Sequence, residues 1–382
     1  IGGSLIMGIS FGLPLYHIFR GFKEGILDWN TIKLLLILYL IALFENILRE
    51  KNILKNMVLS FKTLIKDERI RLISMPTIMG LLPSVGGALF SAPLLEEISE
   101  KTNIESERKS YINYWFRHIW EPFLPIYPGI LLVSVLTDKS INLLVKEALP
   151  YGLAVFAIGL FFAFYKVNPT PTETIQEENQ EVTPDTPFQN PLRIFLLSIL
   201  PIIILLTLVI LFHFDLLYVL IGLVLLLFFI MKVNLEEIKN LLINSLKIQN
   251  LILIAAVMIF KRMLEITGAV SDIAYSLNYS FLPTFIIFFA LPLLAGIFTG
   301  VTSASIGITF PILMRMLPYQ DPVKYIILAF VSAFLGVMVS PLHLCLILTK
   351  EYFQSDWNKL YSQVIKSGIV FGIFLLIKFF LT

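Results

Sequence analysis

Charged and imidazole side chains gather at one point of an otherwise apolar segment. Arg117, His118 and Glu121 directly precede Pro122 in residues 113–135, which are hydrophobic enough to enter a membrane. An ionisable side chain at the bilayer centre costs about 3 kcal/mol or more, so it faces a cavity or a partner. Arg117 and Glu121, four residues apart, share a helix face. Either Glu121 takes up a coupling proton or sodium ion while Arg117 attracts an anion, or the two form a structural ion pair.

A second polar point lies in the sequence Ser340-Pro341-Leu342-His343. Proline removes a backbone hydrogen bond and clashes with the preceding turn, so the helix is expected to break there. His343 beside unwound backbone suits a proton acceptor or an anion donor, because an unperturbed imidazole has a pKa of about 6.5. A buried neutral histidine bonded to a carbonyl is the other interpretation. The single cysteine, Cys345, is expected in core packing.

Two further stretches combine membrane hydrophobicity with glycine, proline and hydroxyl residues. They read MGLLPSVGGALFSAP at 79–93 and LAGIFTGVTSASIGITFP at 294–311. Backbone freed in hydrocarbon is tolerated only where protein or a water-filled cavity covers it, so each stretch is predicted to be a re-entrant hairpin with a ligand at its tip. Tight helix packing is the alternative reason for the small residues. The candidate substrate- or ion-binding residues are Ser84, Gly86, Gly87, Ser91, Thr299, Thr302, Ser303, Ser305, Ser340 and His343.

The two stretches align with each other. Setting Gly80 over Gly296 places Val85 on Val301, and the proline that follows each hairpin recurs at nearly the same spacing, at Pro122 and Pro341. Two unrelated kinks would also give such a match. Matching broken helices in two halves of a chain are, however, typical of secondary transporters built from inverted repeats.

Composition places the 382-residue chain in a membrane. Hydrophobic residues make up 57% and charged residues 15%, and the mean hydropathy is +0.84, whereas soluble domains are about 25% charged. The net charge of +2 comes from loop residues and gives no reason to expect nucleic acid. Four separated histidines and one cysteine show no metal-ligand spacing, so no cofactor is expected and no metal beyond a possible Na⁺. The absence of a P-loop disfavours ATP-driven transport.

The predicted fold is an all-α polytopic membrane protein of two inverted repeats. Residues 1–165 form the first repeat, with a hairpin at about 72–96 and a broken helix at about 113–135. Residues 166–190, rich in Pro, Thr and Glu, form a linker. Residues 191–382 form the second repeat, with a hairpin at about 283–317 and a broken helix at about 322–349. The other expected elements are spans at 1–19, 31–48, 141–165, 192–212, 215–232, 248–265 and 359–381, an amphipathic helix at 51–66 and a short arm at 271–280.

The two halves and their loop charges set the expected topology. Three spans precede the second hairpin and two precede the first, so a first span is expected upstream of residue 1. Loops on the side of 49–71 and 166–190 carry 18 Lys and Arg against 10 on the other side, which places 49–71 and 166–190 in the cytoplasm. The hairpins then enter from opposite faces of the membrane, as inverted repeats require.

In this plan the chain resembles the ion-transporter superfamily, which includes divalent-anion:sodium symporters and gluconate and citrate permeases. Within it the sequence is most similar to an uncharacterised family of prokaryotic integral membrane proteins known as a domain of unknown function. The resemblance implies a homodimer in the prokaryotic inner membrane, with a scaffold and a transport domain that moves like an elevator. Symporters carry Ser-Asn-Thr at the hairpin tips, where this chain has Ser84-Val85-Gly86-Gly87 and Thr302-Ser303-Ala304-Ser305.

The function expected from these observations is secondary active transport of a small anionic solute, coupled to protons or sodium. A sodium/proton antiporter is the alternative, with Glu121 central and Arg117 structural. An intramembrane enzyme using His118, Glu121 or His343 on lipid or peptide is a third reading, but no recognisable nucleophile or metal set accompanies them, so no enzyme is expected. A non-transporting assembly subunit would leave the two matching broken-helix pairs unexplained.

Overall fold

The protein is described from a computed structural model, which covers residues 1–83, 87–100, 102–167, 190–269 and 282–381. Every regular element in these residues is helical, and none of them forms a strand. Four helices are long and apolar enough to cross a membrane by length and composition, and a pair bent by 50° makes a fifth. The structure is therefore all-helical and compatible with a polytopic membrane protein.

The helices follow one another closely along the chain. They are α1 (Gly2–Ser10), α2 (Leu15–Leu27), α3 (Trp29–Glu50), α4 (Ile53–Leu64), α5 (Glu68–Met79), α6 (Ala88–Ser99), α7 (Ser106–Arg117), α8 (Pro128–Thr137), α9 (Ile141–Phe164), α10 (Pro191–Leu206) with the π-helical turn η1 (Thr207–Leu211), α11 (Leu216–Ile230), α12 (Leu235–Asn244), α13 (Ile248–Thr267), α15 (Thr284–Thr299), α16 (Thr302–Leu313), α17 (Pro322–Met338), α18 (Leu344–Phe353) and α19 (Trp357–Leu381).

The helices that can span a membrane coincide with predicted spans. They are α3, α9, α10 with η1, α19 and, in the bent pair, α13, whereas its partner α12 lies outside every predicted span. The span predicted at 215–232 is helix α11, which is apolar but shorter than these helices. Side-chain caps set where two of them begin, because the Asp28 carboxylate accepts from the N–H groups at the start of α3 and the Ser140 hydroxyl does so for α9. The amphipathic segment predicted at 51–66 is helix α4. Residues 168–189 of the linker predicted at 166–190, and the whole arm predicted at 271–280, lie outside the described residues.

The prediction of one span over residues 1–19 is wrong. The structure has two short helices there, α1 and α2, which pack against each other and on α13. Gly12 has a φ of +68°, a left-handed conformation that favours glycine. Pro14 is the residue immediately before α2. These two residues turn the chain back on itself, so the apolar stretch is folded in two.

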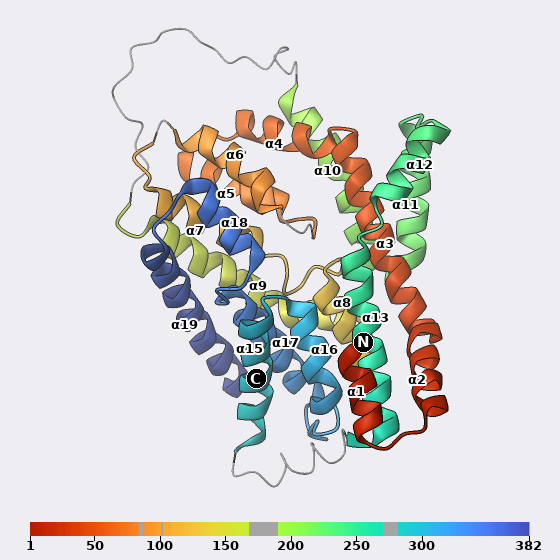
Figure 1. Cartoon of the computed structure of the whole chain (residues 1–382). Helices are drawn as coiled ribbons and strands as arrows, with labels where there is room; N and C mark the ends of the chain where they lie inside the picture. Colours follow the sequence, from red (N-terminus) through yellow and green to blue (C-terminus); the bar gives the residue numbers. More distant parts are fainter. Residues whose placement is uncertain (84–86, 101, 168–189, 270–281, 382) are drawn as a thin grey trace, which may run out of the picture.

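The helices form two groups that meet near the middle of the molecule (Figure 1). The span group consists of α1–α4 and α10–α13, where α13 packs on α2 and α3, and α11 packs on α3. The hairpin group consists of α5–α9 and α15–α19. The two groups touch chiefly where α13 contacts α16 and α3 contacts α8.

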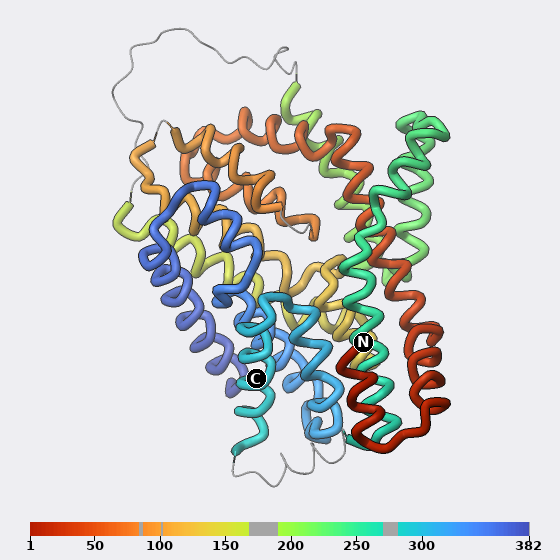
Figure 2. The backbone as a smooth tube through the Cα atoms, in the orientation of Figure 1, coloured from red at the N-terminus to blue at the C-terminus, as the bar shows by residue number. Residues whose placement is uncertain are grey.

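Each half of the hairpin group begins with two helices that are close in the sequence and pack on each other. α5 and α6 form the first pair, and α15 and α16 form the second. Figure 2 shows the first pair extending from the upper left toward the middle, and the second pair rising from the bottom toward the middle. Residues 84–86, at the first turn, lie outside the described residues. At the second turn Gly300 has a φ of +63°, so glycine is needed there.

Two helices separated by a non-helical segment follow each pair, and Pro122 and Pro341 lie in these segments. α7 ends at Arg117, and α8 begins at Pro128, which suits the first turn of a helix because its missing N–H would have no partner there. In the second half α17 ends at Met338 and α18 begins at Leu344. The residues between are 118–127 and 339–343.

The two halves of the hairpin group pack in a reciprocal pattern. Within each half the first hairpin helix lies on the helix before the break, α5 on α7 and α15 on α17. Between the halves, α6 packs on α18 and α16 packs on α8. The second arm of each hairpin is therefore covered by the short helix that follows the other half's break.

Glycines permit the closest backbone contacts in both halves. A Cβ added at Gly80 would lie 2.2 Å from the carbonyl oxygen of Arg117, and one added at Gly336 would lie 2.1 Å from that of Leu293. Gly296, which the sequence alignment places over Gly80, also lies close to α17, with a hypothetical Cβ 2.5 Å from the carbonyl oxygen of Ala333. Each hairpin thus rests on the backbone of its own broken helix.

Candidate functional site

A cavity of about 190 Å³ lies where the hairpin group meets α3 and α13. Its wall takes residues from the first hairpin, from both broken helices, from the second hairpin turn and from the span group. The polar or ionisable members are Arg117, His118, Glu121, Tyr127, Asn250, Thr302, Ser303, His343 and Cys345. Residues far apart in the sequence are thus brought to one place, at the centre of an apolar molecule.

The N-terminal ends of three helices face this cavity. Its wall contains the first residues of α8 (Pro128 and Gly129), of α16 (Thr302 and Ser303) and of α18 (Leu344 and Cys345). None of the three helices has a side-chain hydrogen bond at its N-cap. The first N–H groups of a helix have no partner within it and carry partial positive charge, so three such ends favour a bound anion.

Ionisable side chains at the first break line the same cavity. Arg117 and His118 are buried, with exposed fractions of 4% and 5%. Glu121 accepts a hydrogen bond from the hydroxyl of Thr302, which joins the first broken helix to the second hairpin. A cation, a carboxylate and a hydroxyl therefore line one cavity, as an anion site with a proton- or cation-binding group requires.

The imidazoles of His118 and His343 meet across the two breaks. Their ring centroids are 4.8 Å apart with the planes at 89°, and the ring of Tyr114 lies beside both. The hydroxyl of Tyr114 donates to the carbonyl oxygen of Met338 at 2.8 Å. Each of His118, His343 and Cys345 has a ring nitrogen or sulfur atom that lies within 4.8 Å of those of the other two. The two broken helices are thus joined by polar side chains at the level of the cavity.

Several predicted site residues make internal hydrogen bonds and do not line the cavity. Thr299, Ser305 and Ser340 each donate to a backbone carbonyl oxygen. Their acceptors, in the same order, are Ala295 at 2.7 Å, Pro292 at 2.8 Å and Ile297 at 2.6 Å. These bonds satisfy carbonyls of α15 and fix the second hairpin against the second break. A role for the three hydroxyls in binding stays a prediction.

Ser91 has a similar place in the first hairpin. Its hydroxyl donates to the Oδ1 atom of Asn113 at 2.6 Å, and the amide of Asn113 donates to Thr349 Oγ1 at 3.1 Å. This chain of bonds joins α6, α7 and α18. Gly87 is the N-cap residue of α6. Ser84 and Gly86 lie outside the described residues, so their predicted roles stay predictions.

The structure adds polar residues that the sequence reading missed. Asn250 reaches the cavity from α13, and an amide inside an apolar span was the signal that could have indicated it. Tyr127 lines the cavity and its hydroxyl donates to the carbonyl oxygen of Gly80, bridging the first break to the first hairpin turn. No sequence spacing connects either residue to the hairpins, because the contacts arise from the packing of distant segments.

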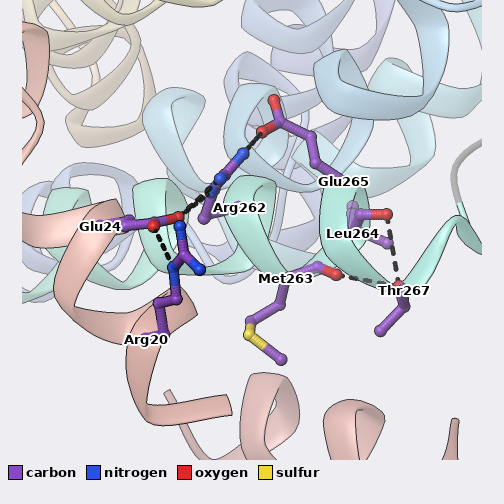
Figure 3. Close-up of polar contacts among 7 residues, drawn as sticks. All are labelled: Arg20, Glu24, Arg262, Met263, Leu264, Glu265 and Thr267. Atoms are coloured by element: carbon purple, nitrogen blue, oxygen red, sulfur yellow. Dashed lines mark hydrogen bonds and ion pairs between the residues drawn. The ribbon is translucent and has the colours of Figure 1, made fainter. Parts of the chain in front are cut away.

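A larger hollow of about 870 Å³ lies on the outside, between α2 and α13. Arg262 donates there to Glu24 and to Glu265, and Arg20 donates to Glu24 (Figure 3). These side chains are partly exposed, with fractions between 33% and 58%. Exposed ion pairs of this kind contribute little stability. The cavity where the hairpin group meets α3 and α13, which is lined by buried polar side chains, is therefore the stronger candidate for a functional site.

Comparison with known proteins gives a family and no assigned activity. Residues 23–380 match the family described as "Protein of unknown function (DUF401)". No curated protein matches the chain.

Proposed function

Since this chain belongs to the DUF401 family of proteins of unknown function, we propose from its geometry that it is a secondary active transporter for a small anionic solute. The observation that carries the proposal is the cavity into which Arg117 and three uncapped helix N-termini project. Transporters of inverted repeats bind anionic groups at the N-termini of broken helices near the bilayer midplane.

The reciprocal packing supports an internal duplication. Each half presents the same order of hairpin, broken helix and long helix, and the contacts of α6 with α18 are mirrored by those of α16 with α8. A pseudo-two-fold relation between halves produces this exchange. The close approaches at Gly80 and Gly296 fall at positions that the sequence alignment pairs. We propose that the two pairs are re-entrant hairpins that enter from opposite faces of a prokaryotic inner membrane, with 49–71 and 166–190 in the cytoplasm.

The proposed chemistry assigns separate roles to the charged groups. Arg117 and the helix ends attract the anion. Glu121, which accepts the Thr302 hydroxyl, takes up the coupling proton or sodium ion. Protonation removes the carboxylate charge and changes this hydrogen bond between the first break and the second hairpin, so coupling-ion binding and the hairpin position become linked.

The proposed movement carries the hairpin group past the span group in an elevator-like manner. The span group would act as the scaffold of a homodimer. The two groups meet over few elements, and the guanidinium of Arg49 in α3 lies 4.0 Å from the ring centroid of Phe90 in α6. Such a contact can be broken and remade at small cost, because a cation–π pair contributes about 0.5–1 kcal/mol at exposed sites.

A sodium/proton antiporter is the second candidate. The contact between Glu121 and Thr302 favours it, since carboxylate and hydroxyl oxygens are the ligands that hard cations prefer. In that case Arg117 would be structural and no organic solute would move. No cofactor is proposed for either function, and we do not propose that the chain is an enzyme.

Proteoliposomes containing the full chain distinguish these functions. A solute transporter shows counterflow of a labelled anion from a panel of small carboxylates and inorganic anions, and imposed proton or sodium gradients drive its uptake. Sodium alone collapses a pH gradient if the chain is an antiporter. If vesicles of verified orientation show neither counterflow nor the sodium-driven collapse of a pH gradient, the proposal is overturned.

Substitutions then assign the roles. We expect Glu121→Gln to keep counterflow and lose uptake driven by the gradient, because the amide cannot take up the ion. Arg117→Gln is expected to weaken anion affinity by about tenfold, since a hydrogen bond to a charged group contributes roughly 1.5–3 kcal/mol. Glu265→Gln, which changes a carboxylate outside the cavity, is the matched control. Unchanged coupled uptake in Glu121→Gln would show that another group couples transport.

A further inference from the structure

Three potential metal ligands converge on one wall of the cavity. His118 follows α7 at the first break, whereas His343 and Cys345 lie at the start of α18 after the second break. One ligand atom of each lies within 4.8 Å of the other two, and all three residues are buried. Ligand atoms of a tetrahedral zinc site with nitrogen and sulfur are about 3.3–3.7 Å apart. The set therefore has to close by about 1 Å when it binds a metal ion.

The surroundings of His118 fix its orientation as they do for metal-binding histidines. Its Nδ1 atom lies 2.7 Å from the carbonyl oxygen of Tyr114. A backbone carbonyl at that distance holds the proton on Nδ1 and leaves the lone pair on Nε2. Histidines that bind metal ions commonly have such a second bond, which orients the ring and raises its basicity as a ligand.

His343 gives an independent reason to expect a ligand at this wall. The side chain is buried, with an exposed fraction of 8%, and its Nδ1 atom has no hydrogen-bond partner among the described residues. A buried polar atom without a partner costs about 1–3 kcal/mol. Because His343 lines the cavity, a ligand bound there would satisfy this atom.

The atom types of the set favour a soft or borderline ion. Cys345 is the second residue of α18, and a cysteine loses its proton when it binds a metal ion. Thiolate and imidazole ligands select zinc or copper over magnesium, calcium or sodium.

We infer that His118, His343 and Cys345 form a site for a transition-metal ion of the Zn²⁺ or Cu⁺ class, which joins the two broken helices at the cavity wall. The three side chains supply three ligands, and a fourth coordination position faces the cavity, where water or an anionic group completes the shell. The site goes beyond the proposed transport activity. Its occupancy is measurable with the metal alone, so its failure and the failure of transport are separate results.

The test uses the purified full chain in detergent with Zn²⁺ and Co²⁺ as probes. We expect Zn²⁺ to raise the melting temperature of the metal-free protein in a concentration-dependent manner, because it binds only the folded site. Co²⁺ is expected to give the thiolate-to-cobalt charge-transfer band in the near ultraviolet. Cys345→Ser should abolish this band and weaken Zn²⁺ binding at least tenfold, and His343→Gln should weaken binding similarly.

The exposed His17 provides the matched control, because His17→Gln removes an imidazole outside the cavity and should bind Zn²⁺ as the unmodified chain does. Equal Zn²⁺ affinity in Cys345→Ser, His343→Gln and the unmodified chain would overturn the inference. A cobalt complex of the unmodified chain without the thiolate band would do the same, and that measurement does not depend on any variant folding.

Discussion

The unit made of α5–α8 and the unit made of α15–α18 share a backbone plan and differ in the chemistry they bring to the cavity. The first contributes Arg117, His118 and Glu121 from a long break at residues 118–127 and the end of α7. The second contributes hydroxyls at the hairpin turn, His343 from the end of the shorter break at 339–343, and Cys345 from the start of α18.

This difference separates what the fold requires from what the site requires. Both units keep the glycine contacts that bring a hairpin onto its broken helix. Among the described residues that line the cavity, the carboxylate and the guanidinium both come from the first unit. The shared features therefore serve packing, whereas the features that differ are those expected of groups with distinct roles in binding and coupling.

The largest expected effect tests the shared backbone plan. Gly80→Ala and Gly336→Ala each place a methyl group against a carbonyl that cannot move independently of its helix. We expect each to destabilise the protein by about 1–3 kcal/mol, as overpacking does, and to lower the melting temperature in detergent. Gly222→Ala, with nothing within 4 Å of the added carbon, is the control. If only one of the two glycines is sensitive, the packing of the units is not equivalent.

A smaller effect is expected where the two units exchange a hydrogen bond. Thr302→Val removes the hydroxyl that donates to Glu121 while keeping the shape of the side chain. A hydrogen bond to a charged group contributes roughly 1.5 kcal/mol at the low end, so gradient-driven uptake in proteoliposomes should fall about tenfold. Thr302→Ser keeps the donor and should retain uptake. Equal loss in both variants would assign the effect to packing and leave the two units chemically independent.

The smallest effect concerns stability at the junction of the breaks. Tyr114→Phe removes the donor to the carbonyl of Met338, which joins α7 of the first unit to the end of α17 in the second. One buried hydrogen bond is worth about 1 kcal/mol, and we expect a correspondingly lower free energy of unfolding. Tyr319→Phe, at a fully exposed position, should leave it unchanged. No change in Tyr114→Phe would show that the rings alone hold this junction.

Much of the element order could be predicted from the sequence. Long apolar runs gave α3, α9 and α19, and the prolines near 122 and 341 gave the two breaks. The folded-back N-terminus could not be read from apolarity, because a run of residues 1–19 has the length of a span whether or not Gly12 turns it. The turn became visible only through the left-handed φ of that residue.

Some of the polar residues that line the cavity were predicted one by one, but the group was not. Glu121 and Thr302 were each candidates, and their hydrogen bond depends on how the second hairpin packs on α8. His118, His343 and Cys345 showed no metal-ligand spacing in the sequence, because His118 follows α7 whereas His343 and Cys345 lie at the start of α18. Reading distances along the chain cannot reveal a cluster that two distant segments create in space.

The exchange of contacts between α6 and α18, and between α16 and α8, has a consequence for biosynthesis. The ribosome releases the first hairpin long before α18, near the C-terminal end, has been made. Until then the surface of α6 that α18 will cover needs lipid or an insertion factor as a temporary neighbour. A nascent chain stopped after α9 therefore remains an unfinished half, and its native arrangement waits for the last helices to arrive.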